Sequence, residues 1–359
     1  MMTDDAHEPL EGADLTPPRA PSLRPDDWLQ RRRRKLALVA VLVVLVAAGL
    51  FVWLRPSRVA RDTLLGLPKG LMMAASIDMQ RLLSAELLAA PLGTTEGQAG
   101  IEQARTRFGL DPRELLVLAM GLDVAGGEIG LIAILRGRYD VPKLRAALAE
   151  IPDSEATTLG GEPATLLRFD VPLAEAIPAL SYVAEGDDQD VMLAALPVLP
   201  DLVFAVRDDR TLIAGTRRLL DAWLAGTSRL GDDDALADLV TGETSAGALG
   251  VGVAQWEGDG EGIRLFTTLQ GLVMPKLGLP AESAWPSMEG VFDFEIDGRK
   301  LDGRGLYRMR SEADAKAMEE RLIRSNEASR AMTGGLVKQT VRRDGNDVRI
   351  TMGFTIPGP

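Results

Sequence analysis

The sequence predicts an α+β protein in which antiparallel sheets carry helices on one face, arranged as two related halves and preceded by one transmembrane helix. A run of 19 uncharged residues, Leu36 to Leu54, predicts the membrane helix. Pairs of short apolar runs joined by polar or glycine-containing turns and followed by helical patterns predict the sheets and their helices. The same order of units recurs later in the chain, which predicts the two halves.

The chain begins with a segment, residues 1–35, that is predicted to be a disordered cytoplasmic tail because it is rich in Pro, Asp and Glu. Its acidic and basic residues balance, so the net charge of −12 falls on the part that follows the membrane helix. The tail ends in five consecutive cations, Arg31 to Lys35, whereas the arginines after Leu54 are fewer and spread out. The positive-inside rule therefore predicts a cytoplasmic N-terminus and an exported C-terminal region.

The run from Leu36 to Leu54 would span roughly 28 Å as a helix, close to the thickness of a bilayer's hydrocarbon core. It has no polar face, unlike a buried core helix, and Trp53 lies where an indole prefers the headgroup layer. The alternative is a cleavable signal peptide, for which Val46-Ala47-Ala48 offers a cleavage site. The apolar run continues past Ala48, which favours an uncleaved signal anchor.

Residues 55–68 are predicted to be a linker, and residues 69–230 to form the first α+β half. Apolar runs and turn residues predict strands at Leu71–Ile77, Leu115–Leu122, Ile129–Leu135, Val203–Val206 and Thr211–Ala214. Helical spacing and capping residues predict helices at Gln80–Leu88, at Thr94–Phe108 before Gly109, at Val141–Ile151 after Asp140, and after Thr216 up to Gly226.

Residues 231–359 are predicted to form the second half with the same order of units. Strands are expected at Leu249–Trp256, Phe292–Ile296, Leu301–Met309 and Val348–Ile356, and helices at Ile263–Leu277 and from Ser311 to Gly334. Val348 to Ile356 alternates apolar and polar residues without interruption after an Asp344-Gly345 turn, which is typical of a strand with one buried face. The shared order predicts an internal duplication, and coincidence is the alternative because strand–strand–helix units are common.

Three successive stretches, LPKGLMMAASIDMQRLLSAELLAAPLG, FGLDPRELLVLAMGLD and LRGRYDVPKLRAAL, resemble those of membrane-anchored bacterial envelope proteins of unknown function, of the kind found in myxobacteria and planctomycetes. The resemblance covers roughly residues 67–225. It implies export and a duplicated α+β domain, and it implies no activity and no site residues.

Several classes of function are excluded by composition. Cysteine is absent, so disulfides, thiolate zinc sites and cysteine nucleophiles are excluded, and the only histidine, His7, lies in the predicted tail. A Ser-His-Asp triad or an HExxH zinc site in the exported part is therefore excluded as well. No phosphate-binding glycine motif occurs, and Gly250-Val251-Gly252 does not continue as a dinucleotide fingerprint. The acidic balance argues against nucleic acid as a partner.

Acidic clusters and two tryptophans are the remaining candidates. The clusters are Asp187, Asp188 and Asp190; Asp232, Asp233 and Asp234; and Glu257, Asp259 and Glu261. None has EF-hand spacing, so each is predicted to be a solvated loop or helix start rather than a calcium site. Trp223 is predicted to be core, and Trp256 to be core or edge packing, with a ligand pocket as its alternative. No catalytic, cofactor-binding or metal-binding residue is assigned.

These observations predict a non-enzymatic, single-pass inner-membrane protein of the bacterial envelope. Its periplasmic α+β domain would bind or scaffold an envelope component, with the lipid bilayer as partner of residues 36–54 and no cofactor. The alternative is a periplasmic domain that binds a small molecule or lipid in a pocket between its halves. A carboxylate-dependent hydrolase is a third hypothesis, which requires two acidic residues facing each other across a cleft.

Overall fold

The structure, a computed structural model, describes residues 58–169, 200–245, 248–258, 260–264, 267, 285–333 and 336–355. Within these ranges, no helix is both long enough and apolar enough to cross a membrane. The predicted tail, the predicted anchor Leu36–Leu54 and most of the helix predicted at Ile263–Leu277 lie outside the described residues.

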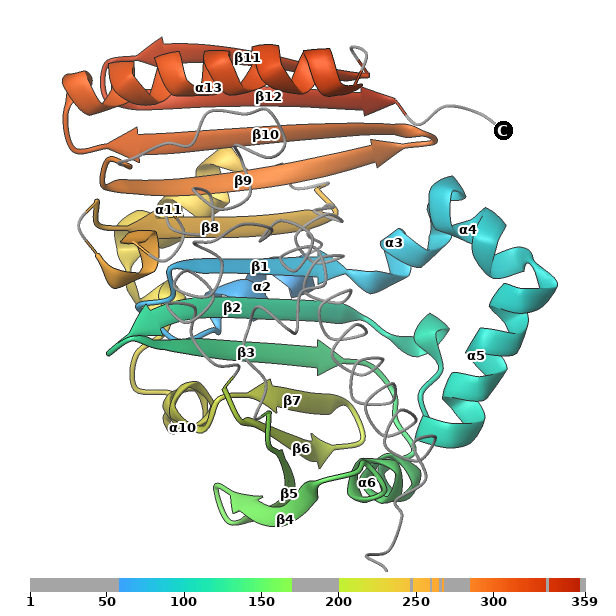
Figure 1. Cartoon of the computed structure of the whole chain (residues 1–359). Helices are drawn as coiled ribbons and strands as arrows, with labels where there is room; N and C mark the ends of the chain where they lie inside the picture. The colour runs from blue at the N-terminus through green and yellow to red at the C-terminus, as the bar shows by residue number, and fades with distance from the viewer. Residues whose placement is uncertain are drawn as a thin grey trace, which may run out of the picture.

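One antiparallel sheet of 12 strands dominates the described part of the chain (Figure 1). Its order is β11-β12-β10-β9-β8-β1-β2-β3-β7-β6-β5-β4. The strands are β1 (Met73–Asp78), β2 (Val117–Ala125), β3 (Glu128–Arg136), β4 (Ser154–Leu159), β5 (Glu162–Leu167), β6 (Leu202–Asp208), β7 (Thr211–Gly215), β8 (Gly250–Trp256), β9 (Met288–Asp297), β10 (Lys300–Met309), β11 (Val337–Asp344) and β12 (Asp347–Thr355). The predicted α+β class with antiparallel strand pairing is confirmed.

The two predicted halves share this sheet rather than forming separate sheets. β1 and β8 pair antiparallel at its centre, with Ala75 opposite Gly252. Outward from that pair, one side runs β1-β2-β3-β7 and the other β8-β9-β10-β12. In each series the first strand of the half is followed by a hairpin, β2–β3 or β9–β10, and then by the last strand of the half, β7 or β12. The first half has an additional hairpin, β4–β5, beyond β6, and the second half has no described counterpart to it.

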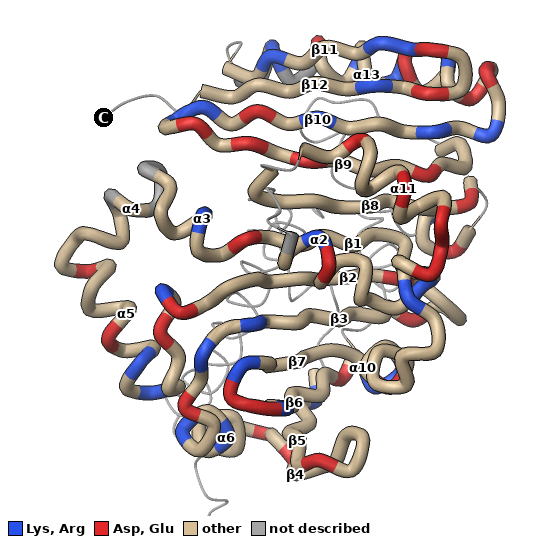
Figure 2. The backbone as a smooth tube through the Cα atoms, turned by 180° about the vertical axis from the view of Figure 1, so that it is seen from behind, with Lys and Arg blue, Asp and Glu red and all other residues tan. Residues whose placement is uncertain are grey.

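The helices lie on both faces of the sheet, so the prediction that they cover one face is wrong. Val291 and Phe292 are consecutive in β9 and therefore point to opposite faces. Val291 belongs to the main core cluster, which includes Leu64 of α2, whereas Phe292 packs in a second cluster with Met318 of α13. Figure 1 shows α13 in front of the sheet, and the reverse view in Figure 2 shows α2 and α11 in front.

The described residues form eight α-helices and two short 3-10 turns. They are α2 (Arg58–Leu65), α3 (Met79–Ser84), α4 (Glu86–Gly93), α5 (Thr95–Phe108), α6 (Val141–Ala149), α10 (Arg217–Ala225), α11 (Asp234–Glu243) and α13 (Glu312–Thr333), with the short 3-10 turns η1 (Pro112–Glu114) and η2 (Leu230–Asp232). Apolar side chains of α2, α6, α10, α11 and α13 pack in the core clusters beside the sheet, as amphipathic spacing requires.

Helix α2 corrects the predicted linker at residues 55–68. Its residues Ala60 and Leu64 are fully buried, and the helix packs on β1, β2 and β8 at the middle of the sheet. Leu67 is also fully buried just after the helix. Ala60 and Leu64 recur at the four-residue spacing that places both on one side of a helix.

Local signals predicted several elements well. Thr94 caps α5 through its side chain, which accepts from the N–H of Gly97, and Asp140 caps α6 by accepting from Lys143. Ser311 accepts from the N–H of Asp314 at the start of α13. Thr216 does occupy the position before α10, but its hydroxyl donates to the carbonyl of Leu131 instead of capping the helix.

Other elements differ from the prediction. The helix expected at Gln80–Leu88 is two helices, α3 and α4, because Ala85 between them is extended. Strands β4, β5 and β11 and helix α11 were not predicted. β4 and β11 form the two edges of the sheet and are mostly exposed, so they lack the apolar alternation that marks a half-buried strand.

Two of the buried carboxylates each accept two hydrogen bonds from an arginine side chain. The Asp293 side chain is 1% exposed, and it accepts from the N–H of Ser245 at 2.6 Å and from two nitrogens of Arg304 at 2.8 and 3.1 Å. Asp123 of β2 binds Arg218 of α10 through two hydrogen bonds of 2.7 and 2.9 Å. The hydrogen bond to Asp123 raises the pKa of Arg218. These pairs connect neighbouring elements at fixed geometry.

Candidate functional site: a charged cleft at the ends of β3 and β6

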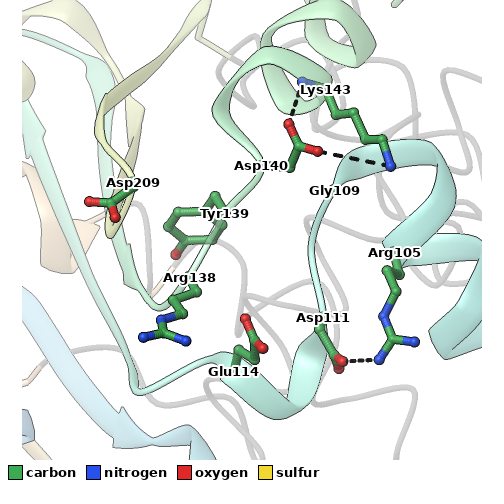
Figure 3. A pocket seen from close by; sticks show the side chains of 9 residues that line it. All are labelled: Arg105, Gly109, Asp111, Glu114, Arg138, Tyr139, Asp140, Lys143 and Asp209. Carbon is green, nitrogen blue, oxygen red and sulfur yellow. Dashed lines mark hydrogen bonds and ion pairs between the residues drawn. The ribbon is translucent and has the colours of Figure 1, made fainter.

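A hollow of about 570 Å³ opens where α5, η1, the β3–α6 connection and the β6–β7 turn meet (Figure 3). It is lined by Arg105, Gly109, Asp111, Glu114, Arg138, Tyr139, Asp140, Lys143 and Asp209. Three of these residues are cationic and four are anionic. The hollow is therefore a polar site, unlike the predominantly apolar pockets that hold most small ligands.

A second hollow of about 290 Å³ adjoins the first, because both are lined by Glu114 and Arg138. Its lining residues are Gln80, Arg113, Glu114, Leu116, Gly137, Arg138 and Arg210. We refer to the two hollows together as the charged cleft. Figure 2 shows acidic and basic residues interspersed along α5, α6 and the β6–β7 region that surround it.

Backbone hydrogen bonds hold the three segments of the charged cleft together. The N–H of Gly137 donates to the carbonyl of Arg210 at 2.9 Å, and the N–H of Tyr139 donates to that of Asp209 at 3.0 Å. The N–H of Asp140 donates to the carbonyl of Gly109 at 2.9 Å. The side chains that line the cleft are therefore carried by a tied framework, although they come from distant parts of the sequence.

Gly109 is required for this framework. It ends α5 in the left-handed conformation, with a φ of 63°, which glycine adopts without steric cost. A Cβ at this position would lie 2.6 Å from the Cβ of Asp140. The close approach lets α5 and the start of α6 form adjacent walls of the cleft.

Two carboxylates of the cleft have structural partners. Asp111 caps η1 and accepts a short hydrogen bond from Arg105, and Asp140 caps α6 and lies 3.9 Å from the Lys143 ammonium (Figure 3). Burial alone would raise the pKa of Asp111, but the hydrogen bonds from Arg105 and from the N–H of Arg113 outweigh it and lower that pKa. Asp111 is therefore ionised at neutral pH and cannot act as a general acid there.

Four other charged residues of the cleft make no side-chain ion pair or hydrogen bond with any described part of the chain. They are Glu114, Arg138, Asp209 and Arg210, all exposed to solvent, and the first three carry no dashed line in Figure 3. These side chains are free to bind a charged group from outside.

Tyr139 belongs to the wall of the cleft rather than to its chemistry. Its hydroxyl donates to the carbonyl of Leu135 at 2.6 Å, and its ring packs with Leu144, Leu148 and Val206 beneath α6. Burial, followed by the charge of Asp208, raises the pKa of its hydroxyl. Tyr139 therefore stays neutral and supports the segment that carries Arg138.

A third hollow, about 150 Å³, lies on the sheet at β9, β10 and β12. Its charged residues already have partners, since Arg349 binds Glu243 of the same lining through hydrogen bonds of 2.5 and 3.1 Å, and Arg304 binds the buried Asp293. The hydrogen bond from Arg349 lowers the pKa of Glu243. Because its charges already have partners, this hollow is a weaker candidate for ligand binding than the charged cleft.

The acidic clusters singled out in the sequence fall outside the charged cleft. Asp232 and Asp233 accept hydrogen bonds from the N–H groups of Arg229 and Leu236, so that cluster begins helices, as one of its two interpretations predicts. Glu257 pairs with Arg310, and Glu261 accepts from the N–H of Gly127. Asp187, Asp188, Asp190 and Asp259 lie outside the described residues. Among the described residues, no cluster of three potential metal ligands occurs.

Both candidate tryptophans pack against the protein. Trp223 packs at the margin of the main core cluster, with Arg207 5.5 Å above its ring centre. Trp256 packs in the cluster beneath α13, its ring edge-to-face with Trp285 at 6.0 Å, and its indole N–H donates to the carbonyl of Pro286. Both side chains are partly buried, which agrees with the predicted core packing of Trp223 and the predicted core or edge packing of Trp256.

The chain was compared with known families, curated proteins and solved structures. No family model and no curated protein matches it. Crystal form III of TP0453 aligns over 81% of this chain and 93% of that chain, with a TM-score of 0.42 and 9% identity. Crystal form IV of TP0453 aligns over 82% and 95%, with a TM-score of 0.40 and 8% identity. Similarity at this level establishes no family and no function for the chain.

No sequence motif predicted the charged cleft. Most of its charged residues come from three short stretches, DPRE at Asp111–Glu114, GRYD at Gly137–Asp140 and RDDR at Arg207–Arg210. Each stretch alone has the composition of a solvated turn. Each stretch lies at an end of a predicted strand or helix, where loops gather and binding residues concentrate. This shared position is the sequence signal that could have indicated the site.

Proposed function

We propose that this chain is a single-pass inner-membrane protein whose periplasmic α+β domain binds or scaffolds an envelope component and catalyses no reaction. The observation that carries the proposal is the charged cleft, a tied framework that presents unpaired charges of both signs. Complementary charges of this kind provide specificity and orientation for a polar partner. A hydrolase is less well supported, because Asp111 and Asp140 serve as helix caps and the other two carboxylates are exposed, whereas a glycosidase acid needs an apolar pocket.

The alternative is a periplasmic domain that binds a small molecule or a lipid. Its pocket was expected between the two halves, yet β1 and β8 pair directly there. The three hollows described above are each lined by residues of one half. A small ligand would therefore bind in the charged cleft of the first half.

We also propose that the two halves arose by duplication. The matching strand series on either side of β1 and β8 supports this idea, with β4–β5 as an insertion in the first copy. α6 and α13 occupy equivalent places in the two series, each between the inner hairpin and the strands that complete its half. The resemblance to myxobacterial and planctomycete envelope proteins stays a prediction.

The proposed anchor would hold the domain close to the bilayer. Only residues 55–57 separate Leu54 from α2, and three residues reach at most about 10 Å. Since α2 is buried at the centre of the sheet, the domain would have no long tether. The charged cleft would then meet partners at or near the membrane surface.

The orientation of the chain is tested by fusing alkaline phosphatase, which is active only when exported, after Gly358. We expect high phosphatase activity, because the five cations before Leu36 outweigh those after Leu54. Neutralising Arg31 to Lys35 should produce inverted molecules and lower the activity. Low activity of the unaltered fusion would refute the orientation, and a mature N-terminus near Ala48 would refute the anchor.

The binding role is tested by placing a photo-crosslinking residue at Leu116, which lines the charged cleft and is 41% exposed. In cells of the native organism, we expect a defined crosslinked product from this position. The matched control is the same residue at Thr340, which lies on the edge strand β11 far from the cleft. A product from Thr340 alone, or from neither position, would contradict a partner in the cleft.

A further inference from the structure

The smaller hollow of the charged cleft is a cationic site within an acidic protein. Its lining includes three arginines, Arg113, Arg138 and Arg210, and one acid, Glu114. The four side chains sum to a charge of about +2, whereas the whole chain carries −12. A local excess of positive charge against that background favours an anionic ligand.

Two of these arginines have no internal counter-ion. Arg138 and Arg210 make no side-chain ion pair or hydrogen bond within the described part of the chain, whereas Arg113 donates to Gln98 and lies 3.8 Å from Asp111. The backbone bond between Gly137 and Arg210 places the two unpaired arginines on adjacent segments. Both guanidinium groups line the same small hollow, and an anion bound there would offset the repulsion between them.

We propose that this part of the charged cleft binds a phosphate group carried by an envelope component. A phosphate monoester has a charge of about −1.5 to −2 at neutral pH and could bind both unpaired arginines, whereas a single carboxylate carries only −1. The planar fork of arginine suits phosphate oxygens. This inference rests on the binding role proposed above and adds the chemical class of the ligand.

The other residues that line the smaller hollow suit the part of the ligand beyond its phosphate group. Gln80 supplies an amide that can donate to an ester or hydroxyl oxygen, and Leu116 supplies an exposed apolar surface beside the arginines. The carboxylates of Glu114, Asp140 and Asp209 border the same cleft. They would repel a long polyanion, so the site suits one phosphate group better than a nucleic acid backbone.

The site is tested with full-length protein in detergent, titrated with inorganic phosphate at constant ionic strength and followed by ³¹P line broadening. We expect binding by the unaltered protein and about tenfold weaker binding for Arg138→Gln and for Arg210→Gln, since each removes a charge-assisted hydrogen bond. The matched control is Arg342→Gln, which removes the same charge from the exposed edge strand β11 and should leave binding unchanged. All three side chains are exposed, so all variants should keep the unaltered thermal unfolding midpoint.

The source of the phosphate is distinguished by repeating the titration in nanodiscs of phosphatidylcholine with or without phosphatidic acid. If a lipid headgroup is the ligand, phosphatidic acid should compete and weaken phosphate binding. If the ligand is a soluble phosphoester, the two discs should give the same affinity. Absence of phosphate binding, or equal binding by all variants, would overturn the phosphate site, whereas loss of the Leu116 crosslink would overturn the binding role itself.

Discussion

Replacing Leu64 with alanine should lower the free energy of unfolding by about 3–4 kcal/mol, because it opens a cavity in the main core cluster. Leu64 is fully buried in α2, between that helix and the centre of the sheet. Urea unfolding followed by tryptophan fluorescence measures the change, since Trp223 packs against the same cluster.

The matched control for this experiment is Val59→Ala, because Val59 lies on the same helix but is 46% exposed. Its expected cost is below about 0.5 kcal/mol, as for most surface substitutions. Equally small effects for the two variants would mean that residues 58–65 behave as the linker that the sequence predicts. A large difference would establish α2 as part of the folded domain.

Replacing Asp293 with alanine should cost about 3 kcal/mol, because Arg304 would keep only its 3.4 Å contact with Glu295 and the N–H of Ser245 would lose the Asp293 carboxylate as acceptor. Removal of one partner from a buried pair costs about 3–5 kcal/mol, and the lower value applies here because the Arg304 side chain is 49% exposed and water can reach it. Chemical denaturation provides the measurement.

Asp302 provides the control for Asp293. It lies on the adjacent strand β10, its side chain is 42% exposed, and it pairs with Lys300 at the surface. Asp302→Ala should cost less than about 1 kcal/mol, as is usual for exposed pairs. If both aspartates cost the same, the buried pair does not contribute more than a surface pair. Asp293→Asn should be intermediate, because it keeps the shape but removes the charge.

Helices and hairpins whose ends are set by neighbouring residues were predictable from the sequence. The hairpin β2–β3 follows from two apolar runs separated by Gly126 and Gly127, which both have positive φ. The boundaries of α5 and α6 follow from Thr94, Gly109 and Asp140, whose capping roles depend only on neighbouring residues. Such signals act over a few residues, so one sequence is enough to identify them.

The arrangement of the elements was less predictable. Antiparallel hairpins do not determine on which face the following helix packs, so the placement of α13 opposite α2 was missed. The edge strands were missed because exposure removes the apolar alternation. The charged cleft was missed because Glu114, Arg138 and Arg210 become neighbours only after long-range strand pairing. These three residues can bind one ligand only because the fold brings them together, and no single stretch of the sequence contains all of them.

The pairing of β1 with β8 also has a consequence for how the chain folds. Ile77 and Gly250 face each other in the sheet but lie about 170 residues apart in the sequence, which gives the fold a high contact order and slows its formation. At a synthesis rate of about 5–20 residues per second, β8 follows β1 by roughly 10–35 s. During that interval one edge of β1 has no partner, and unpaired edges invite aggregation. Truncated chains that end before β8 should therefore need chaperones even though every strand of the first half has been made.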